Sequence, residues 1–177
     1  YYSNHGIEID APKNYKWLYS ESNSFAQKAY IIGGGHVGLA LSEVLSKLNF
    51  EIHLLDHREN LNTMTANHFV QSKEVVEFES IENHIPEGDN IYVIIMSFGY
   101  RTDDIIIRRL LDKKFKYIGM LGSATKINTL FKNLISDGFD ESQIKKVQAP
   151  VGINIKSETT YEIAISIAAQ LINVKNR

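Results

Sequence analysis

The chain has 177 residues and no cysteine, with a hydrophobic content of 44% and a formal net charge of −2. This length suits one domain with a full hydrophobic core. The slightly negative charge argues against a nucleic-acid-binding protein that relies on neutralising phosphates. The lack of cysteine excludes disulfides, thiolate catalysis and cysteine-ligated metal sites within the chain. No apolar run reaches the roughly 18 residues that cross a bilayer, and no signal peptide precedes the domain, so we expect a cytoplasmic protein without a membrane partner.

The first segment, residues 1–28, is predicted to be an N-terminal arm or linker, because it is polar and aromatic with little periodicity. The sequence opens at Tyr1 rather than at Met, so an upstream segment is expected. The aromatic side chains of this arm are expected to pack against the main body or against a second copy of the chain. A homodimer therefore stays open, and residues 29–177 form the main domain.

The stretch from Ala29 to Asp56 carries the motif on which the functional prediction depends. An apolar run at 30–32 is followed by glycines spaced G-x-G-x-x-G, by a helical pattern of apolar residues, and by a second apolar run that ends on Asp56. This order of strand, glycine turn, helix, strand and acid is the context of the dinucleotide-binding fingerprint. The free amides at the helix N-terminus favour an anion, and Asp56 is placed to accept hydrogen bonds from a ribose diol.

Each glycine of the turn has its own expected role. Gly33 allows the tight turn, Gly35 lets a pyrophosphate approach the backbone, and Gly38 lets the helix pack closely on the strand. The alternative is a Rossmann domain whose cleft has lost its ligand.

The rest of the chain alternates between strand and helix patterns. Strands are expected at 74–78, 91–96, 117–121 and 146–149, with a helical turn at 81–85 and a loop at 86–90. Helices are expected after Thr102 as a cap, after Gly122–Ser123 with a stop at Gly138, and after a capping box formed by Thr159 and Glu162. This alternation predicts an α/β fold, a Rossmann-like doubly wound parallel sheet in a three-layer α/β/α arrangement.

The carboxyl ends of parallel strands open on one edge of such a sheet, where ligands bind. The candidate ligand-binding residues are the ones that follow these strand ends. They are Gly33, Gly34, Gly35, His36, Val37, Gly38, Asp56, Arg58, Ser97, Gly122, Ser123, Pro150 and Gly152.

Three of these candidates have a specific alternative. Arg58 is placed to meet a 2′-phosphate or another anionic group, although a surface arginine is the commoner outcome. His36, at the helix start, is expected to contact a ligand without taking part in catalysis. Ser123 is equally explained as an N-cap or as a phosphate ligand.

His53 and His57 lie across a strand end, where their spacing does not bring them together, so no metal site is expected.

Several stretches together resemble one known family. GGGHVGLAL, LLDHR, KYIGMLGSATK and QAPVGINIKSETTYEIAISIAAQL are similar to the C-terminal Rossmann domain of the XdhC/CoxI family, and the last two are the most specific. The resemblance covers the chain from Ala29 to near its end. Members of that family are accessory factors for molybdenum hydroxylases such as xanthine dehydrogenase and carbon monoxide dehydrogenase. They are thought to bind, protect or modify the molybdenum cofactor and to hand it to the apoenzyme.

The sequence departs from the family pattern in three places. Ser97–Phe98–Gly99–Tyr100 stands where the family often has a Thr-His pair, and the helix after Ser123 begins with Ala124–Thr125–Lys126 rather than with consecutive arginines. The cysteine-bearing N-terminal domain of the family is not represented in this sequence.

The resemblance implies a maturation or chaperone-like factor rather than a metabolic enzyme, with a molybdenum hydroxylase apoenzyme as its partner. Its ligand would be a nucleotide such as NAD(P), or the molybdenum cofactor, bound at the glycine turn. The alternatives are an NAD(P)-dependent oxidoreductase, against which the lack of a substrate domain and of a clear proton donor counts, and a nucleotide-sensing regulatory module.

Overall fold

The structure, a computed structural model, describes residues 27–177 in full and the backbone of residues 2–3 and 6–7. Most of the predicted arm at 1–28 therefore lies outside the described residues. The elements in chain order are β1 (Tyr2–Ser3), β2 (Gly6–Ile7), β3 (Gln27–Ile32), α1 (His36–Ser46), β4 (Phe50–Asp56), α2 (Asn62–Ala66), β5 (Ser72–Val75), η2 (Phe78–Asn83), β6 (Gly88–Ile95), α3 (Tyr100–Leu110), β7 (Phe115–Met120), α4 (Ala124–Ser136), α5 (Glu141–Ile144) and α6 (Thr160–Lys175).

Five parallel strands form the central sheet, in the order β5-β4-β3-β6-β7. The first of them in sequence, β3, lies in the middle, and Ile32 at its end pairs with Leu55 of β4 on one side and with Ile95 of β6 on the other. The chain therefore reverses its direction of winding between β3 and β6. This is the switch point at which open α/β sheets bind ligands, and it confirms the predicted doubly wound fold.

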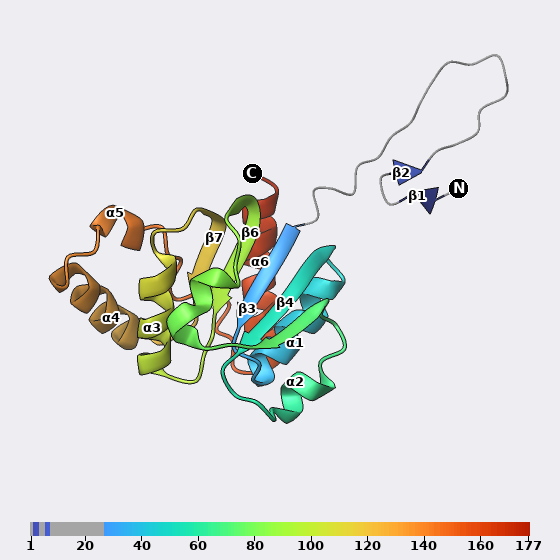
Figure 1. The fold of residues 1–177 in the computed structure, drawn as a ribbon, viewed down its shortest axis with the longest axis horizontal. Helices are drawn as coiled ribbons and strands as arrows, with labels where there is room; N and C mark the ends of the chain where they lie inside the picture. Colours follow the sequence, from blue (N-terminus) through green and yellow to red (C-terminus); the bar gives the residue numbers. More distant parts are fainter. Residues whose placement is uncertain (1, 4–5, 8–26) are drawn as a thin grey trace, which may run out of the picture.

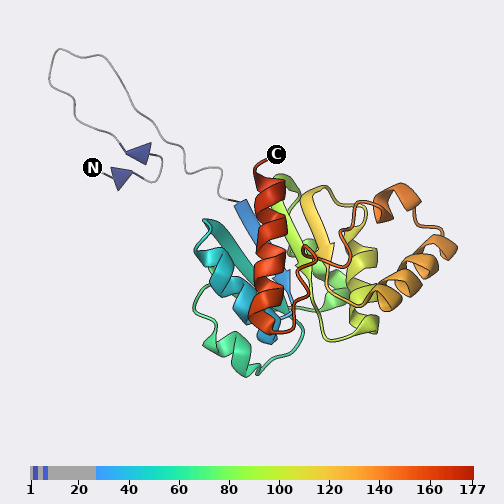
Figure 2. The same ribbon diagram turned by 180° about the vertical axis from the view of Figure 1, so that it is seen from behind.

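Helices cover both faces of the sheet and give three layers (Figures 1 and 2). Helices α1 and α6 pack together over one face, where alternate strand residues such as Ile31 and Tyr92 are fully buried. On the other face, η2, α3 and α4 cover Ile32 and Val93. The central strands β3 and β6 end in continuous apolar runs because both of their faces are buried there.

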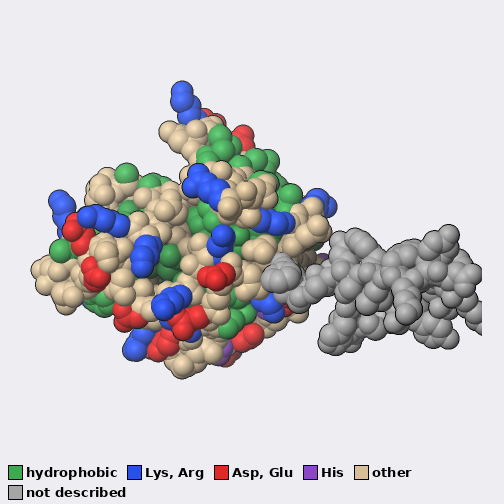
Figure 3. Space-filling view, turned by 90° about the horizontal axis from the view of Figure 1, so that it is seen from above, with side chains coloured by type: hydrophobic (Ala, Val, Ile, Leu, Met, Phe, Trp, Pro, Cys, Tyr) green, Lys and Arg blue, Asp and Glu red, His purple; other side chains and the backbone are tan. Residues whose placement is uncertain are grey.

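Seen from the edge at which β3 begins, the molecule has lysine and arginine side chains interspersed with acidic ones (Figure 3). The opposite edge, at which the strands end, holds the glycine turn. Within the described residues, no helix combines the length and the apolar composition needed to cross a membrane.

Two predicted boundaries around β5 and β6 were wrong. The strand predicted at 74–78 ends at Val75, and the buried Phe78 begins the 3₁₀-helix η2 instead. The loop predicted at 86–90 is shorter, because β6 already begins at Gly88. The pairing of β6 with β7 shifts in register between Gly88 and Tyr92, so the start of β6 is irregular.

Two further predictions near the carboxyl edge need correction. Helix α3 begins at Tyr100 with Gly99 as its N-cap, and Thr102 lies inside the first turn, where its hydroxyl donates to the Gly99 carbonyl at 2.9 Å. The strand predicted at 146–149 is a single bridge between Gln148 and Gly119.

The other predicted helix caps are confirmed. The Ser123 side chain accepts a hydrogen bond from the Lys126 amide, and Thr159 and Glu162 form the complete capping box of α6. Gly138, just past α4, has a φ of +92° that suits the stop predicted there.

Candidate functional site

A cleft of about 670 Å³ opens at the carboxyl edge of the sheet, at the switch point between β3 and β6. One wall is the glycine turn and the start of α1, which contribute Gly35, His36, Val37 and Gly38. The loop after β4, which contains Arg58, and the start of α2 line another part of the cleft. Ser97 and Phe98, which follow β6, line the rest. Of the candidate residues, the structure therefore brings six together in one cleft.

The glycine turn has the shape that the fingerprint requires. A Cβ atom on Gly33 would lie 2.2 Å from the Met96 carbonyl oxygen, and one on Gly38 would lie 2.1 Å from the Gly33 carbonyl oxygen. Gly33 therefore passes closely beside β6, and Gly38 lets α1 pack on the turn. A Cβ on Gly35 would meet nothing within 4 Å, so the space above this residue is open.

The backbone amides of this turn divide into two groups. The Gly33 amide donates to the Leu55 carbonyl oxygen at 2.8 Å and the Gly34 amide to Asp56 Oδ2 at 2.7 Å. Within the part of the chain that the structure describes, the amides of Gly35, His36 and Val37 have no hydrogen-bond acceptor. They belong to the first turn of α1, whose N–H groups have no partner within the helix and carry its positive dipole end.

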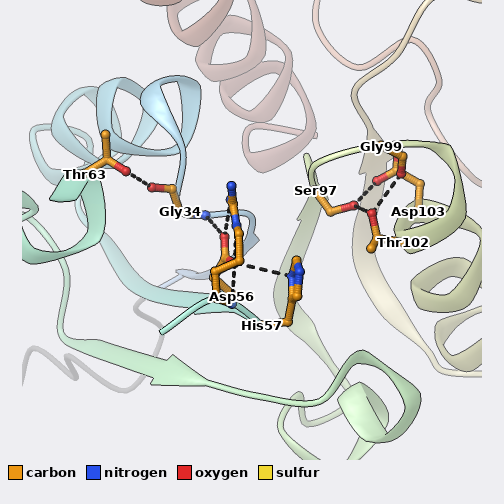
Figure 4. A network of polar contacts seen from close by, with 9 residues as sticks. Gly34, Asp56, His57, Thr63, Ser97, Gly99, Thr102 and Asp103 are labelled. Atoms are coloured by element: carbon orange, nitrogen blue, oxygen red, sulfur yellow. Dashed lines mark hydrogen bonds and ion pairs between the residues drawn. The ribbon is translucent and has the colours of Figure 1, made fainter. Parts of the chain in front are cut away.

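The Asp56 carboxylate is fully engaged with protein donors and is only 1% exposed (Figure 4). Its Oδ2 accepts from the Gly34 amide and from Arg58 Nη2 at 2.8 Å. Its Oδ1 accepts from the amide and from Nε of Arg58, both at 2.9 Å. A ribose diol would have to displace Arg58 to reach either oxygen, so the predicted ribose contact of Asp56 stays a prediction.

The electrostatics of this pair favour the charged forms. Burial alone would raise the pKa of Asp56, but hydrogen bonds from Arg58 and from the Gly34 amide outweigh it and hold that pKa below its usual range. The same contact with Asp56 raises the pKa of Arg58. The carboxylate thus fixes both the glycine turn and the arginine in place.

Arg58 and the neighbouring aromatic residues complete the rim of the cleft. The Arg58 guanidinium carbon lies 5.6 Å from the ring centre of Phe98, which is 80% exposed. The His57 ring packs on Phe78, with ring centres 4.7 Å apart. Its Nδ1 lies 3.5 Å from Asp56 Oδ1. Arg58 and Phe98 therefore bridge the loop after β4 and the end of β6.

Ser97 is part of a second polar cluster, on the opposite side of the cleft from Asp56 (Figure 4). Its Oγ lies 2.5 Å from Asp103 Oδ1 and 2.6 Å from Thr102 Oγ1. Burial raises the pKa of Asp103 to about 6, although hydrogen bonds from Ser97 and the charge of Lys126 act in the opposite direction. Asp103 was not among the residues predicted from the sequence, so this contact was missed.

The remaining candidates lie beside the main cleft rather than in it. Gly122 borders a small hollow with Asp103 and Lys126, while Ser123, which is exposed, serves as the cap of α4. Pro150 and Gly152 border a separate hollow of about 400 Å³. The Leu121 side chain borders all three spaces.

Other residues of the cleft were not among the predicted ones. Thr63 donates from its hydroxyl to the Gly34 carbonyl oxygen at 2.5 Å, which ties the start of α2 to the glycine turn. The polar stretch that contains α2 has no clear period, so the sequence offered no signal for this contact. No group of three or more metal-ligating side chains is present within the described residues.

Comparison with known proteins identifies the type of domain. A family model described as the XdhC Rossmann domain matches residues 29–171. The uncharacterized protein YqeB of Escherichia coli K12 is 32% identical over 151 residues, which are 82% of this chain and 27% of that protein. A Bacillus subtilis protein described as a probable subunit of xanthine dehydrogenase is 33% identical over 84 residues, which are 48% of this chain and 23% of that protein.

Among solved structures, a crystal structure described as a xanthine dehydrogenase from Bacillus halodurans superposes with a TM-score of 0.70 and 28% identity. The match covers 85% of this chain and 43% of that one. The chain thus spans about a quarter of the length of the two curated relatives and less than half of the solved structure. With its sheet order, its glycine turn and the match over 29–171, the chain belongs to the XdhC family, of which it contains the Rossmann domain.

Proposed function

We propose that this chain is the nucleotide-binding domain of an accessory factor for a molybdenum hydroxylase of the xanthine dehydrogenase type. Its cleft would bind a phosphate-bearing ligand, either a nucleotide or the molybdenum cofactor, at the glycine turn. The observation that carries the proposal is that the amides of Gly35, His36 and Val37, which border the cleft, have no acceptor among the described residues and that the space above Gly35 is open. The names of the Bacillus relatives support the choice of partner.

The residues present fit a phosphate group better than they fit a ribose diol. The turn offers amide donors and the positive end of α1 to an anion. The acid that would accept a ribose hydroxyl is held by Arg58 through three hydrogen bonds. A ligand with its diphosphate on the turn, and with its remaining part along Arg58 and Phe98, satisfies these contacts without breaking the Asp56 pair.

The role of accessory factor, rather than of a dehydrogenase, is supported by family membership. In such a role, the domain's own residues would bind and orient the ligand and exclude water from one side of it. When bound, the molybdenum cofactor would supply the redox chemistry of the partner enzyme.

A ligand panel tests the binding half of the proposal. Thermal unfolding would be followed with NAD⁺, NADP⁺, ADP, ATP and molybdopterin, because a ligand that binds only the folded state raises its stability. At a concentration of 100 times its Kd, a ligand adds about 2.7 kcal/mol. A shift with one of these compounds is expected, and the lack of a shift with all of them would instead favour a cleft that has lost its ligand.

The partner half needs a separate measurement on the full-length protein. Co-purification with a molybdenum hydroxylase apoenzyme, and gain of hydroxylase activity on mixing, are the expected results. Turnover of a hydride donor by the protein alone, with NAD⁺ or NADP⁺ as the stabilising ligand, would instead establish the oxidoreductase alternative.

A further inference from the structure

Four oxygen atoms form a connected row in the wall of the cleft that lies across from Asp56 (Figure 4). Asp103 Oδ1 is 2.5 Å from Ser97 Oγ, which is 2.6 Å from Thr102 Oγ1, which is 2.9 Å from the Gly99 carbonyl oxygen. Ser97 also borders the cleft that contains the glycine turn. The row therefore begins at a carboxyl group behind the cleft and passes through a hydroxyl on its surface.

Counting protons shows that these three contacts depend on the charge of Asp103. Each contact needs one proton between its two oxygens. Ser97 and Thr102 supply one hydroxyl proton each, and the Gly99 carbonyl supplies none. All three contacts are hydrogen bonds at the same time only if Asp103 carries the third proton. When Asp103 is ionised, one of the three pairs of oxygens has no proton between them.

The surroundings of Asp103 favour the protonated form. Its side chain borders a small hollow with apolar residues from β7 and α4, among them Met120 and Leu130. The other titratable groups that border this hollow, among the described residues, are Lys126 on α4 and Tyr100 at the start of α3. Tyr100 is occupied with Asn133. Hydrogen bonds from the Ser97 side chain and amide, and the charge of Lys126, oppose the effect of burial. Burial is the larger effect, and it raises the pKa of Asp103 to about 6.

We propose that Ser97 donates a hydrogen bond to an anionic oxygen of the ligand, and that Asp103 is the positioning residue whose proton makes this possible. A protonated Asp103 donates to Ser97 Oγ. The Ser97 hydroxyl proton, which then lies toward Thr102 in the free protein, can turn to a ligand oxygen while Thr102 keeps its bond to the Gly99 carbonyl. An ionised Asp103 instead takes that proton for itself and places a negative charge behind the cleft wall. The inference rests on the proposed function, since it assigns a second contact to the same ligand.

The consequence is that binding of an anion takes up a proton. An anion near Ser97 disfavours the charge on Asp103 and therefore raises its pKa further. Affinity is then highest below the pKa of the free protein and falls as the pH rises above it. Between these limits the Kd increases about tenfold for each unit by which the ligand raises the pKa of Asp103.

The test is calorimetric titration of the protein with NAD⁺ between pH 5 and pH 8. NAD⁺ is a suitable probe because its diphosphate bridge does not titrate in this range. The expected result for the native chain is a Kd that increases several-fold from pH 5 to pH 8. Asp103→Asn should bind with a Kd that does not change with pH and is lower than the native value at pH 8, because the neutral amide donates to Ser97 at every pH.

The matched control is Asp104→Asn, which removes the neighbouring carboxylate of the same helical turn. Asp104 is paired with Arg108 at 2.9 Å and does not contact Ser97. This variant should keep the pH dependence of the native chain. Ser97→Ala should raise the Kd at pH 5 and weaken its dependence on pH, because it removes the proposed donor and leaves only the effect of the Asp103 charge.

A second measurement decides the role of Asp103 without any ligand. Its side-chain carboxyl carbon, assigned by comparison with Asp103→Asn, would be titrated by NMR, and a midpoint near pH 6 is expected. A midpoint near the ordinary aspartate value, about 4, would overturn the inference. If NAD⁺ binds with the same Kd at every pH, the inference is wrong and the proposed function stands. If NAD⁺ does not bind at any pH, the Ser97 contact is contradicted, and the proposed function is decided by the rest of the ligand panel.

Discussion

Asp56 and Arg58 form a two-pronged ion pair directly beside the glycine turn, with Arg58 Nη2 2.8 Å from Oδ2 and Nε 2.9 Å from Oδ1. The same carboxylate accepts from the Gly34 amide, so it connects the end of β4 to the turn that follows β3. In the sequence this acid was interpreted as a ribose-binding residue. In the structure the Gly34 amide and Arg58 donate to both of its oxygens, so Asp56 supports the shape of the cleft.

Removal of this support should be costly. Asp56→Ala leaves the Gly34 amide and part of the Arg58 guanidinium without an acceptor, and we expect the free energy of unfolding to decrease by about 3 kcal/mol. Urea unfolding measures this loss. The control is Asp104→Ala, whose pair with Arg108 is partly exposed and should contribute less than about 1 kcal/mol. Equal losses in the two variants would contradict the supporting role of Asp56.

The pKa of Asp103 predicts a pH dependence of stability. Its folded-state pKa, about 6, is above the ordinary aspartate value of 3.8, so the folded protein holds this proton more tightly than the unfolded chain does. Its contribution to stability is therefore complete below pH 4 and is lost as the pH rises to about 6.

A comparison with Asp103→Asn isolates this effect from the other titrating groups. Relative to the variant, the native chain should lose about 2 kcal/mol of unfolding free energy between pH 4 and pH 7. Chemical unfolding at a series of pH values gives the difference. A difference that stays constant over this range would show that Asp103 has an ordinary pKa.

The second and third glycines of the G-x-G-x-x-G motif should respond differently to substitution by alanine. Gly38→Ala places a Cβ 2.1 Å from the Gly33 carbonyl oxygen, and we expect a loss of about 3 kcal/mol because backbone must move. Gly35→Ala meets open space and has an ordinary φ of −73°, so it should change stability by less than about 1 kcal/mol. Thermal unfolding of the two variants compares them directly.

The capping box of α6 makes a prediction of ordinary size. The Thr159 side chain accepts from the Glu162 amide, and the Glu162 carboxylate accepts from the Thr159 amide at 2.9 Å. Thr159→Ala should cost about 1 kcal/mol. Thr125→Ala, on the exposed first turn of α4, is the comparison, and an equal effect there would argue against a special role of the box.

Much of the fold followed from local patterns in the sequence. The apolar runs of β3, β4, β6 and β7 and the helical pattern of α1 are strong signals, because each strand is buried on both faces. The roles of Gly33 and Gly38 also followed, since glycines at this spacing between a strand and a helix are typical of the close approach seen here. The end of β5 and the bridge at Gln148 were misjudged because short edge segments depend on tertiary contacts rather than on propensity.

The candidate site was predictable only in part. The turn at 33–38 could be placed because its contacts are local, whereas the contacts of Asp56 and Asp103 depend on which donors the folded chain brings to them. Nothing in the sequence distinguishes an acid that faces a ligand from one that is covered by Arg58. The link from Thr63 to Gly34 crosses 29 residues of sequence, and no local pattern predicts such a contact.

The most direct test of the proposed anion site uses two substitutions at Gly35. A side chain fits there without a clash, and the backbone conformation of this N-cap suits an aspartate. In Gly35→Asp, the new carboxylate would occupy the amides that we assign to the ligand while keeping α1 stable, whereas Gly35→Ala leaves those amides free.

The decisive measurement is the Kd of the stabilising nucleotide for the native chain and for these two variants, by calorimetry at one pH. We predict binding that is nearly unchanged in Gly35→Ala and at least about tenfold weaker in Gly35→Asp, from repulsion and lost amide contacts. Equal affinity in all three proteins would contradict the assignment of the anion site to the start of α1.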